Sequence, residues 1–567
     1  MRLRLRPSRI AALALAVSAL PVAGATLDVA WWRDGKLSAV QLQDDGSSRP
    51  APFDGARAVP LGSLWKLFVY LYAVENKLPT PDYHCAGQLP EEVYCCPAGQ
   101  SVARDAALAQ SCGLFFAPAR LLVERRPWLA YWTRRLGRAP VGELDWLADP
   151  ARLTPERAVS LRSLMLALAS LPPASRADAE AALLRVVLSA RGAHTVSWFG
   201  SRLRVKTFSW HQIEHPARRL GGAAGWLADG TPVWFAGADS SSAILQKWAP
   251  RLAAILPAAA PAGDAGCVVV DYFARYPIRS VTSGAVAAAP GALHGTYQVR
   301  FENGRSLALH SQGDLTLARD AAGRARLQGR FGVNDYVARV LEREGNSDLP
   351  EAAKALAVAA RSYLQQNAVR AEGCQRIADS SATQRVSPSP AGAAARAIAL
   401  WTDQLVLVGP NVRYHLDQPG ADTLVWRSAL EQARQGRRFD DILASAFPRA
   451  ELTTLAGGAA LPCMPLPVAE AWLARELPRW ERLLRREPGY ERPPELPAVC
   501  ELAGGLPYSE QSRNRIYLRG LATREDRITL AHEFLHLGLR NHPRGQDEAL
   551  VEQLARRLVD ARLETPL

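Results

Sequence analysis

A short motif near the C-terminus carries the side chains of a metal-dependent hydrolase. His532-Glu533-Phe534-Leu535-His536 lies in an apolar stretch that follows a capping-box pattern from Thr523 to Asp526. On a helix, both histidines share one face and can bind one zinc ion, and the glutamate between them can activate a water. We therefore predict a single Zn²⁺ site with His532 and His536 as ligands and Glu533 as the catalytic base.

Two residues are candidates for a third zinc ligand. His542 follows the motif, but Leu539 occupies the place where a longer histidine motif has glycine. Glu548 begins a second helical stretch that contains Glu552 one turn later. In this pattern the first acid binds the metal and the second holds a histidine ring. Both candidates stay open, and the spacing favours Glu548.

A different carboxylate, Glu344, ends an apolar-periodic segment that begins at Val333. The dipole of a helix disfavours a carboxylate at its C-terminus, so Glu344 needs a reason to be there. With the alanine-rich segment Leu349–Tyr363, this stretch closely resembles the sporulation stage II protein D family (SpoIID/LytB). That resemblance implies a lytic transglycosylase that cleaves peptidoglycan strands, with Glu344 as the catalytic acid and base. Glu342 is the neighbouring alternative.

A serine and a lysine near the N-terminus form another chemical pattern. In Ser63-Leu64-Trp65-Lys66, both side chains fall on one helix face, where the serine can act as nucleophile and the lysine as base. Ser111 and Lys206 lie in later segments, Ser-Cys-Gly and Val-Lys-Thr. The three segments together resemble the penicillin-binding and serine β-lactamase family, which implies a catalytic role for all four residues.

Two residues depart from that family's pattern. Gly113 stands where the family has asparagine, and Phe208 stands where it has glycine. The ring of Phe208 would obstruct the substrate groove, so a degenerate site that only binds peptidoglycan is an alternative. Another alternative is that Ser63 simply caps its helix.

Lysines are scarce, since the chain has only six of them. A lysine that remains can supply chemistry that needs an amine, because an arginine does not lose its proton near neutral pH. One of the six, Lys354, lies in the alanine-rich segment of the SpoIID-like region. We expect it to support or pair with the site there.

Several features of the chain indicate export. Residues 1–25 have a basic start, an apolar run and a small-residue cleavage site, as in a signal peptide. The eight cysteines favour disulfides, and their grouping favours Cys267–Cys374 and Cys463–Cys500. We predict a periplasmic or secreted protein without a transmembrane segment after signal cleavage.

The charge of the chain bears on its partners. The net charge is +13 and the isoelectric point is near 9.6, which suits an anionic polymer such as the cell wall. No dense basic run interleaved with aromatic residues is present, so we do not expect nucleic acid as a partner.

The motifs divide the chain into a multidomain α+β protein. After the signal peptide we predict a penicillin-binding or β-lactamase-like domain over residues 26–262 and a SpoIID-like α+β domain over 263–440. A mainly α-helical, zincin-like domain is predicted over 441–567.

The whole chain resembles a family of bacterial secreted proteins of the DUF2300 type. Some members are encoded beside α2-macroglobulin-like proteins, which implies such a protein as a possible partner. We predict an envelope protein that acts on peptidoglycan, with a lytic-transglycosylase-like centre and a zinc peptidase or amidase centre. The alternatives are a non-catalytic module that binds peptidoglycan or a partner, and a secreted zinc protease.

Overall fold

The computed structural model describes most of the chain after the predicted signal peptide. The described residues are 25–137, 144–188, 195–212, 215–257, 266–320, 322–381, 383–409, 411–420, 422–448, 450–455, 463, 465–493, 495–502, 507–510, 514–539, 545 and 547–560. Residues 1–24 of the predicted signal peptide and the candidate ligand His542 therefore lie outside the described residues.

The N-terminal domain is built on a six-stranded antiparallel sheet, in the order β3-β2-β1-β11-β10-β9. Its strands are β1 (Thr26–Arg33), β2 (Lys36–Gln43), β3 (Ser48–Pro50), β9 (Leu203–Gln212), β10 (His215–Leu227) and β11 (Pro232–Ala238). Helix α7 (Ser241–Ile255) follows the last strand. The Val-Lys-Thr segment lies on β9, at one edge of the sheet, and β10, β11 and α7 follow it in the chain.

A central helix positions the serine and lysine of this domain. The 3-10 turn η1 (Gly62–Leu64) leads into α1 (Trp65–Glu75), and the residues from Trp65 to Ala73 are all buried. A helix that is apolar on every side must be surrounded by other elements. Here α2 (Arg104–Gln110) and α5 (Pro173–Leu183) pack against α1, and rings of α3 (Arg125–Leu136) contact its aromatic side chains. Helix α4 (Leu161–Ala169) belongs to the same hydrophobic core.

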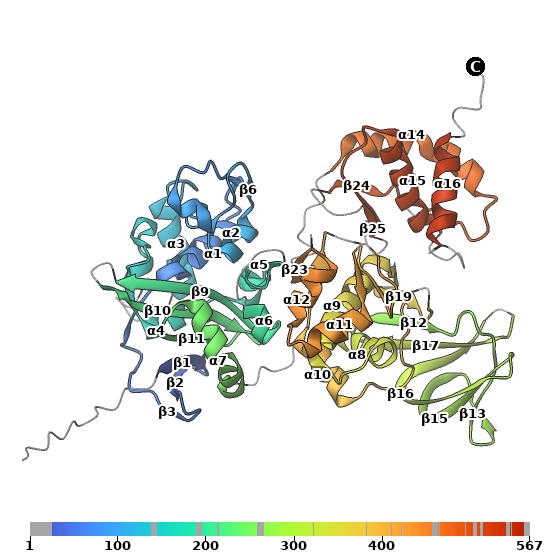
Figure 1. Cartoon of the computed structure of the whole chain (residues 1–567), viewed down its shortest axis with the longest axis horizontal. Helices are drawn as coiled ribbons and strands as arrows, with labels where there is room; N and C mark the ends of the chain where they lie inside the picture. The colour runs from blue at the N-terminus through green and yellow to red at the C-terminus, as the bar shows by residue number, and fades with distance from the viewer. Residues whose placement is uncertain are drawn as a thin grey trace, which may run out of the picture.

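The middle domain combines an eight-stranded sheet with a group of helices (Figure 1). The strand order is β14-β13-β15-β16-β17-β12-β19-β18. The strands are β12 (Val268–Tyr272), β13 (Ile278–Ser283), β14 (Val286–Ala287), β15 (Gly291–Phe301), β16 (Ser306–Arg319), β17 (Ala325–Phe331), β18 (Val369–Ala371) and β19 (Cys374–Ala378).

Helices α8 (Val333–Glu344) and α9 (Pro350–Asn367) follow β17 and carry the SpoIID-like segments. The alanines of α9 are buried, and small side chains let neighbouring helices approach closely. The helices packed against α9 are α8, α10 (Ala393–Trp401), α11 (Trp426–Arg434) and α12 (Phe439–Ala446).

The N-terminal and middle domains share a sheet and a core. Strand β23 (Glu451–Thr454) pairs with β20 (Leu405–Val408) on one side and with β8 (Val186–Val187) on the other. Leu184 belongs to the same hydrophobic cluster as the middle domain, and Arg438 lies 3.8 Å above the ring of Trp198. Segments far apart in sequence therefore hold these two domains together.

The C-terminal domain packs three helices against a small sheet of order β24-β26-β25. The strands are β24 (Ala498–Glu501), β25 (Tyr508–Glu510) and β26 (Arg515–Leu518), and the helices are α14 (Pro467–Leu484), α15 (Arg524–Gly538) and α16 (Glu548–Asp560). The predicted capping box is present, since Thr523 accepts from the backbone of Asp526 and Asp526 accepts from the backbone of Thr523. These caps fix where α15 begins.

Four disulfides join the eight cysteines: Cys85–Cys96, Cys95–Cys112, Cys267–Cys374 and Cys463–Cys500. The last two are the pairs that the sequence favoured. Within the described ranges, no helix combines the length and low polarity needed to cross a bilayer.

Candidate functional sites

Helices α15 and α16 bring three potential metal ligands together. His532, His536 and Glu548 each offer a ligand atom within 4.8 Å of the others. The Nε2 atoms of the two histidines are 3.1 Å apart, and Nε2 of His532 is 3.1 Å from Oε2 of Glu548. Both rings therefore direct the same nitrogen toward the carboxylate of Glu548.

The other nitrogen of each ring has its own partner. Nδ1 of His532 lies 3.1 Å from Oε2 of Glu552, and Nδ1 of His536 lies 3.2 Å from the carbonyl oxygen of Gly545. Acceptors at Nδ1 hold the proton there and direct the lone pair of Nε2 toward the cluster, as the hydrogen-bond partners of metal-binding histidines do. Two histidines that merely lay on the polar face of a helix would need no such partners at both ring nitrogens.

The ionisable groups of the cluster shift one another's pKa values. Burial lowers the pKa of His532, but Glu548, Glu533 and Glu552 outweigh burial, so its pKa is raised overall. Burial raises the pKa of Glu548, yet its contacts with His532 and His536 bring that pKa well below its ordinary value. Glu533, which follows His532 in the chain, is buried. The carboxylates thus concentrate negative charge around two imidazoles.

A cleft of about 490 Å³ opens onto this cluster. Its walls come from both the C-terminal and the middle domain. The lining residues are Asn411, Arg413, His415, Gln418, Pro419, Gly420, Thr423, Pro507, Thr529, His532, Glu533, Glu548 and Glu552.

Glu344 lies at the end of α8 and turns its carboxyl group into the middle domain. Its Oε1 accepts a hydrogen bond of 2.7 Å from the backbone N–H of Arg385. Burial raises the pKa of Glu344, and the Arg385 hydrogen bond and charge only partly offset that effect. A raised pKa is what a carboxylic acid needs to donate a proton near neutral pH.

The neighbouring Glu342 has a different role. It is exposed, and its Oε1 accepts a hydrogen bond of 2.8 Å from the backbone N–H of Gly392, which precedes α10. Glu342 thus links two helices, and the environment of Glu344 is the one suited to proton transfer.

A glutamine that the sequence did not single out organises the surroundings of Glu344. Gln384 is fully buried, donates to the hydroxyl of Tyr414 at 3.0 Å, and accepts from the hydroxyl of Tyr336. Arg385 follows Gln384 in the chain, and its backbone N–H is the donor to Glu344. Two adjacent residues therefore form hydrogen bonds with Tyr414 and with Glu344. The Gln384 side chain joins segments remote in sequence, so only the fold reveals its role.

A second cleft, of about 450 Å³, adjoins this region and is lined by Arg343 and Arg385. Asp379 lies in the same lining, accepts from the backbone N–H of Val386 at 2.9 Å, and has its pKa raised by burial. The other lining residues are Phe273, Arg275, Tyr276, Phe301, Asn303, Arg305, Ser306, Leu307, Ser380 and Ser381. Aromatic rings and guanidinium groups suit a sugar polymer with acidic substituents.

Lys354 has a structural role instead of the site role that the sequence left open. Its Nζ pairs with Glu351 at 2.5 Å and lies 4.0 Å above the ring of Trp401. The second oxygen of Glu351 accepts from the backbone N–H of Phe439 at 2.9 Å. Lys354 therefore connects α9 with α10 and α12.

In the N-terminal domain, one lysine bridges the two predicted serines. Nζ of Lys66 donates to Oγ of Ser63 at 3.1 Å, to Oγ of Ser111 at 3.1 Å and to the carbonyl of Ser111 at 2.7 Å. No capping hydrogen bond is made by a side chain at the start of η1 or α1. Ser63 thus faces Lys66 and does not serve as a helix cap.

Two buried lysines lie near each other at this site. Burial lowers the pKa of Lys66 to about 8. Burial, together with the charge of Lys66, lowers the pKa of Lys206 to about 7. An amine with such a pKa can accept a proton from a serine near neutral pH.

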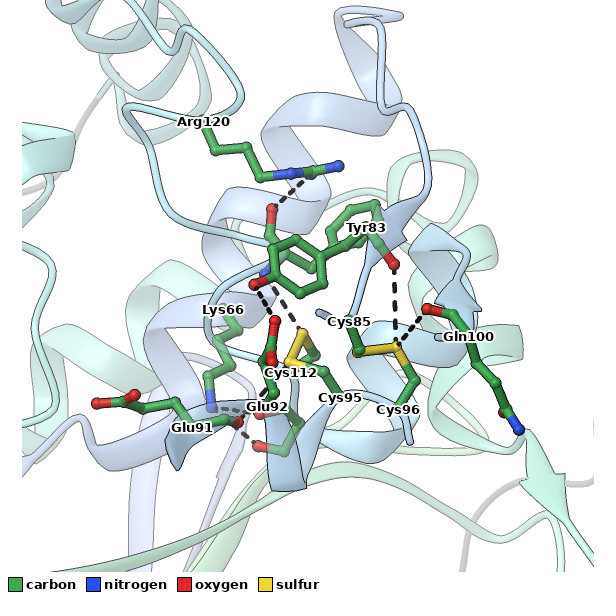
Figure 2. Close-up of a disulfide and its surroundings, with 12 residues drawn as sticks. Lys66, Tyr83, Cys85, Glu91, Glu92, Cys95, Cys96, Gln100, Cys112 and Arg120 are labelled. Atoms are coloured by element: carbon green, nitrogen blue, oxygen red, sulfur yellow. Dashed lines mark hydrogen bonds between the residues drawn. A yellow bond between two sulfur atoms is a disulfide. The ribbon is translucent and has the colours of Figure 1, made fainter. Parts of the chain in front are cut away.

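A disulfide lies directly beside the Lys66 contacts. Figure 2 shows Lys66 near the bridge between Cys95 and Cys112, and Cys112 follows Ser111 in the chain. Ser111 has a φ of 68°, in the left-handed region that residues other than glycine seldom adopt. The Cys95–Cys112 disulfide anchors the chain at the residue directly after Ser111.

The two departures from the penicillin-binding pattern are visible at the site. Phe208 is buried, and a Cβ at Gly62 would lie 3.0 Å from the Cβ of Phe208. The ring therefore fills space beside the residue that precedes Ser63. Gly113 lies against the stem of Lys66 and has no side-chain amide to offer, since a Cβ there would meet Cε at 3.4 Å.

Parts of the chain match models of two known protein families. Residues 323–403 match the family model described as "Stage II sporulation protein" (SpoIID), which covers α8 and α9. Residues 87–217 and 422–544 match the model described as "Predicted secreted protein (DUF2300)". Together with the four disulfides, these matches define a periplasmic or secreted multidomain α+β protein that contains a SpoIID domain.

The chain belongs to the same family as the protein of Escherichia coli (strain K12) named "Uncharacterized protein YfaQ". The two are 44% identical over 521 residues, which cover 92% of this chain and 93% of the relative.

Similar solved structures include two class D β-lactamases. The enzyme from Bacillus subtilis is 11% identical, with a TM-score of 0.28, and the match covers 41% of this chain and 93% of that enzyme. The enzyme YbXI from Nostoc is 14% identical, with a TM-score of 0.27, and the match covers 41% and 93%.

Proposed function

We propose that this protein is a cell-envelope enzyme that acts on peptidoglycan through two centres. The first cleaves glycan strands with Glu344, and the second is a zinc hydrolase at His532, His536 and Glu548. The observation that carries the proposal is the environment of Glu344. Glu344 lies within the SpoIID match, is half-buried, and accepts a hydrogen bond from one backbone N–H, and burial raises its pKa.

Glu344 can perform both proton transfers of a lytic transglycosylase. As an acid it donates its proton to the glycosidic oxygen when the bond to the next sugar breaks. The resulting carboxylate then accepts the proton of the sugar's 6-hydroxyl as that oxygen closes the anhydro ring. The proton balance is complete without water, because the group that gives up a proton recovers one.

The residues of the C-terminal cluster fit a zinc ion. Two imidazole nitrogens and a carboxylate oxygen converge, and both outer ring nitrogens have acceptors. His532, His536 and Glu548 would hold the metal. When bound, zinc supplies a Lewis acid and lowers the pKa of a coordinated water. Glu533 would accept the proton of the attacking water and pass it to the leaving amine.

Digestion of purified sacculi tests the first centre. The wild-type protein should release muropeptides with anhydro ends, and Glu344→Gln should release none while it keeps the fold. The matched control is Glu342→Gln, which changes the exposed neighbour on the same helix. Release that is equal for Glu344→Gln and wild type would refute a catalytic role for Glu344.

Metal analysis tests the second centre independently. Purified wild-type protein should contain about one zinc per chain, and His532→Ala should contain none. A wild-type protein without zinc affinity would leave Glu344 as the sole proposed centre.

A further inference from the structure

The wall of the metal cleft that faces α15 and α16 belongs to the middle domain. Its lining residues are Asn411, Arg413, His415, Gln418, Pro419, Gly420 and Thr423. Two of them lie on β21 (Arg413–His415), which pairs in parallel with β22 (Thr423–Val425). The metal ligands and the surface opposite them are therefore contributed by different domains.

Successive residues of β21 have different partners. Tyr414 accepts the hydrogen bond of Gln384 in the Glu344 region, whereas Arg413 and His415 line the metal cleft. Nη2 of Arg413 lies 2.5 Å from Oε1 of Glu548, across the boundary between the domains. The hydrogen bond between Tyr414 and Gln384 fixes β21 on the side of the middle domain. The same strand can therefore hold Arg413 in a constant position at the cleft.

The chemistry of the lining restricts what the cleft can bind. Its side chains are a guanidinium, imidazoles, carboxylates, amides and hydroxyls, and the apolar contribution is limited to Pro419, Gly420 and Pro507. A cleft with this lining gives little stabilisation to a large apolar side chain. Arginine, in contrast, matches the geometry of a carboxylate with two parallel N–H donors.

Given the zinc centre proposed above, we propose that the cleft takes a polar peptide with a free carboxylate close to the hydrolysed bond, and that Arg413 binds this carboxylate. The contact with Glu548 engages Nη2, and a guanidinium has further N–H donors for a second acceptor. Arg413 is partly exposed, at 39% of its side chain, so a ligand in the cleft can reach it. Peptides of the cell wall, which carry several free carboxylates, belong to this class.

Binding of two small hydroxamates tests the proposal without turnover. Succinic acid monohydroxamate carries a metal-binding group and a free carboxylate, and its amide analogue has the same shape without the charge. Both are titrated calorimetrically into zinc-loaded Glu533→Gln protein. The acid should bind about tenfold more tightly than the amide, because it adds a charge-assisted contact.

Arg413→Ala in the same background should abolish the preference for the acid, and Arg413→Lys should retain part of it. The matched control is Arg427→Ala, which removes a more exposed arginine that is absent from the cleft lining. Equal affinities for acid and amide in the Glu533→Gln protein would overturn the proposal.

Zinc content, measured before each titration, distinguishes a failure of the proposed zinc centre from a failure of the role proposed for Arg413. If the Glu533→Gln protein binds no zinc, the proposed zinc centre fails, and the assignment of Arg413 fails with it. If that protein binds zinc but Arg413→Ala does not, Arg413 positions Glu548 for the metal, and the substrate role is refuted.

Discussion

Glu552 and His532 are joined through a contact of 3.1 Å between Oε2 of the carboxylate and Nδ1 of the ring. Glu552 lies one turn after Glu548 on α16, so the same helix holds a ligand candidate and the partner of another. This contact fixes which nitrogen of His532 faces His536 and Glu548. It makes Glu552 the residue that should tune metal affinity without touching the metal.

Glu552→Gln should therefore weaken zinc binding by about 10- to 100-fold and leave the fold intact, because an amide holds the ring less firmly than a carboxylate. Competition with a chromophoric chelator measures the dissociation constant. Glu431→Gln, which alters an exposed acid on α11, is the control. An unchanged affinity in Glu552→Gln would argue against a metal site of this design.

Glycan cleavage should decline as pH rises through the folded-state pKa of Glu344. Burial raises this pKa above the ordinary value of 4.5, and the protonated form is the one that donates to the glycosidic oxygen. The alkaline limb of kcat/KM should therefore lie above 4.5. Activity that increases with pH across this range would contradict the assignment.

Arg385→Ala should move that alkaline limb to higher pH. The positive charge of Arg385 favours the carboxylate form of Glu344, and the backbone hydrogen bond is retained in the variant. Arg376→Ala, which removes an exposed arginine paired with Asp271, should leave the limb in place. The pH dependence of kcat/KM on sacculi distinguishes the variants, and a limb that moves to lower pH would refute the electrostatic explanation.

Lys206→Met should change how stability depends on pH. Burial, with the nearby charge of Lys66, lowers the folded pKa of Lys206 to about 7 from 10.5. Between these values the unfolded chain binds more protons, so the lysine makes stability increase with pH above 7. From pH 7 to pH 9 the wild type should gain roughly 2 kcal/mol relative to the variant.

Thermal melts of both proteins at the two pH values measure this difference. Lys36→Met, which replaces an exposed lysine at the start of β2, should show the wild-type dependence. If the stability of wild type and Lys206→Met changed in parallel, Lys206 would not be titrating in this range.

Local patterns predicted a large part of the fold. The helix over Val333–Glu344 and the capping box at Thr523 follow from periodicity and short-range hydrogen bonds, which neighbouring residues determine. The cysteine grouping predicted two disulfides for a different reason, because both cysteines of each pair lie within one predicted domain.

Contacts between distant segments could not be predicted from such local patterns. Gln384 is an ordinary polar residue in the sequence, and only the packing of α8, α9 and β21 gives it three buried partners. Arg413 meets Glu548 because two domains come together, a placement that no spacing encodes. The pairing of β23 with β8 joins two predicted domains in the same way.

Mass spectrometry of the products from sacculi digested by four proteins tests the central claim most directly. The proteins are wild type, Glu344→Gln, Glu533→Gln and the double variant. We expect anhydro-ended muropeptides from every protein that retains Glu344, and cleaved peptide or amide bonds from every protein that retains Glu533. Undigested sacculi with zinc-loaded wild type would contradict an enzymatic role in the cell wall.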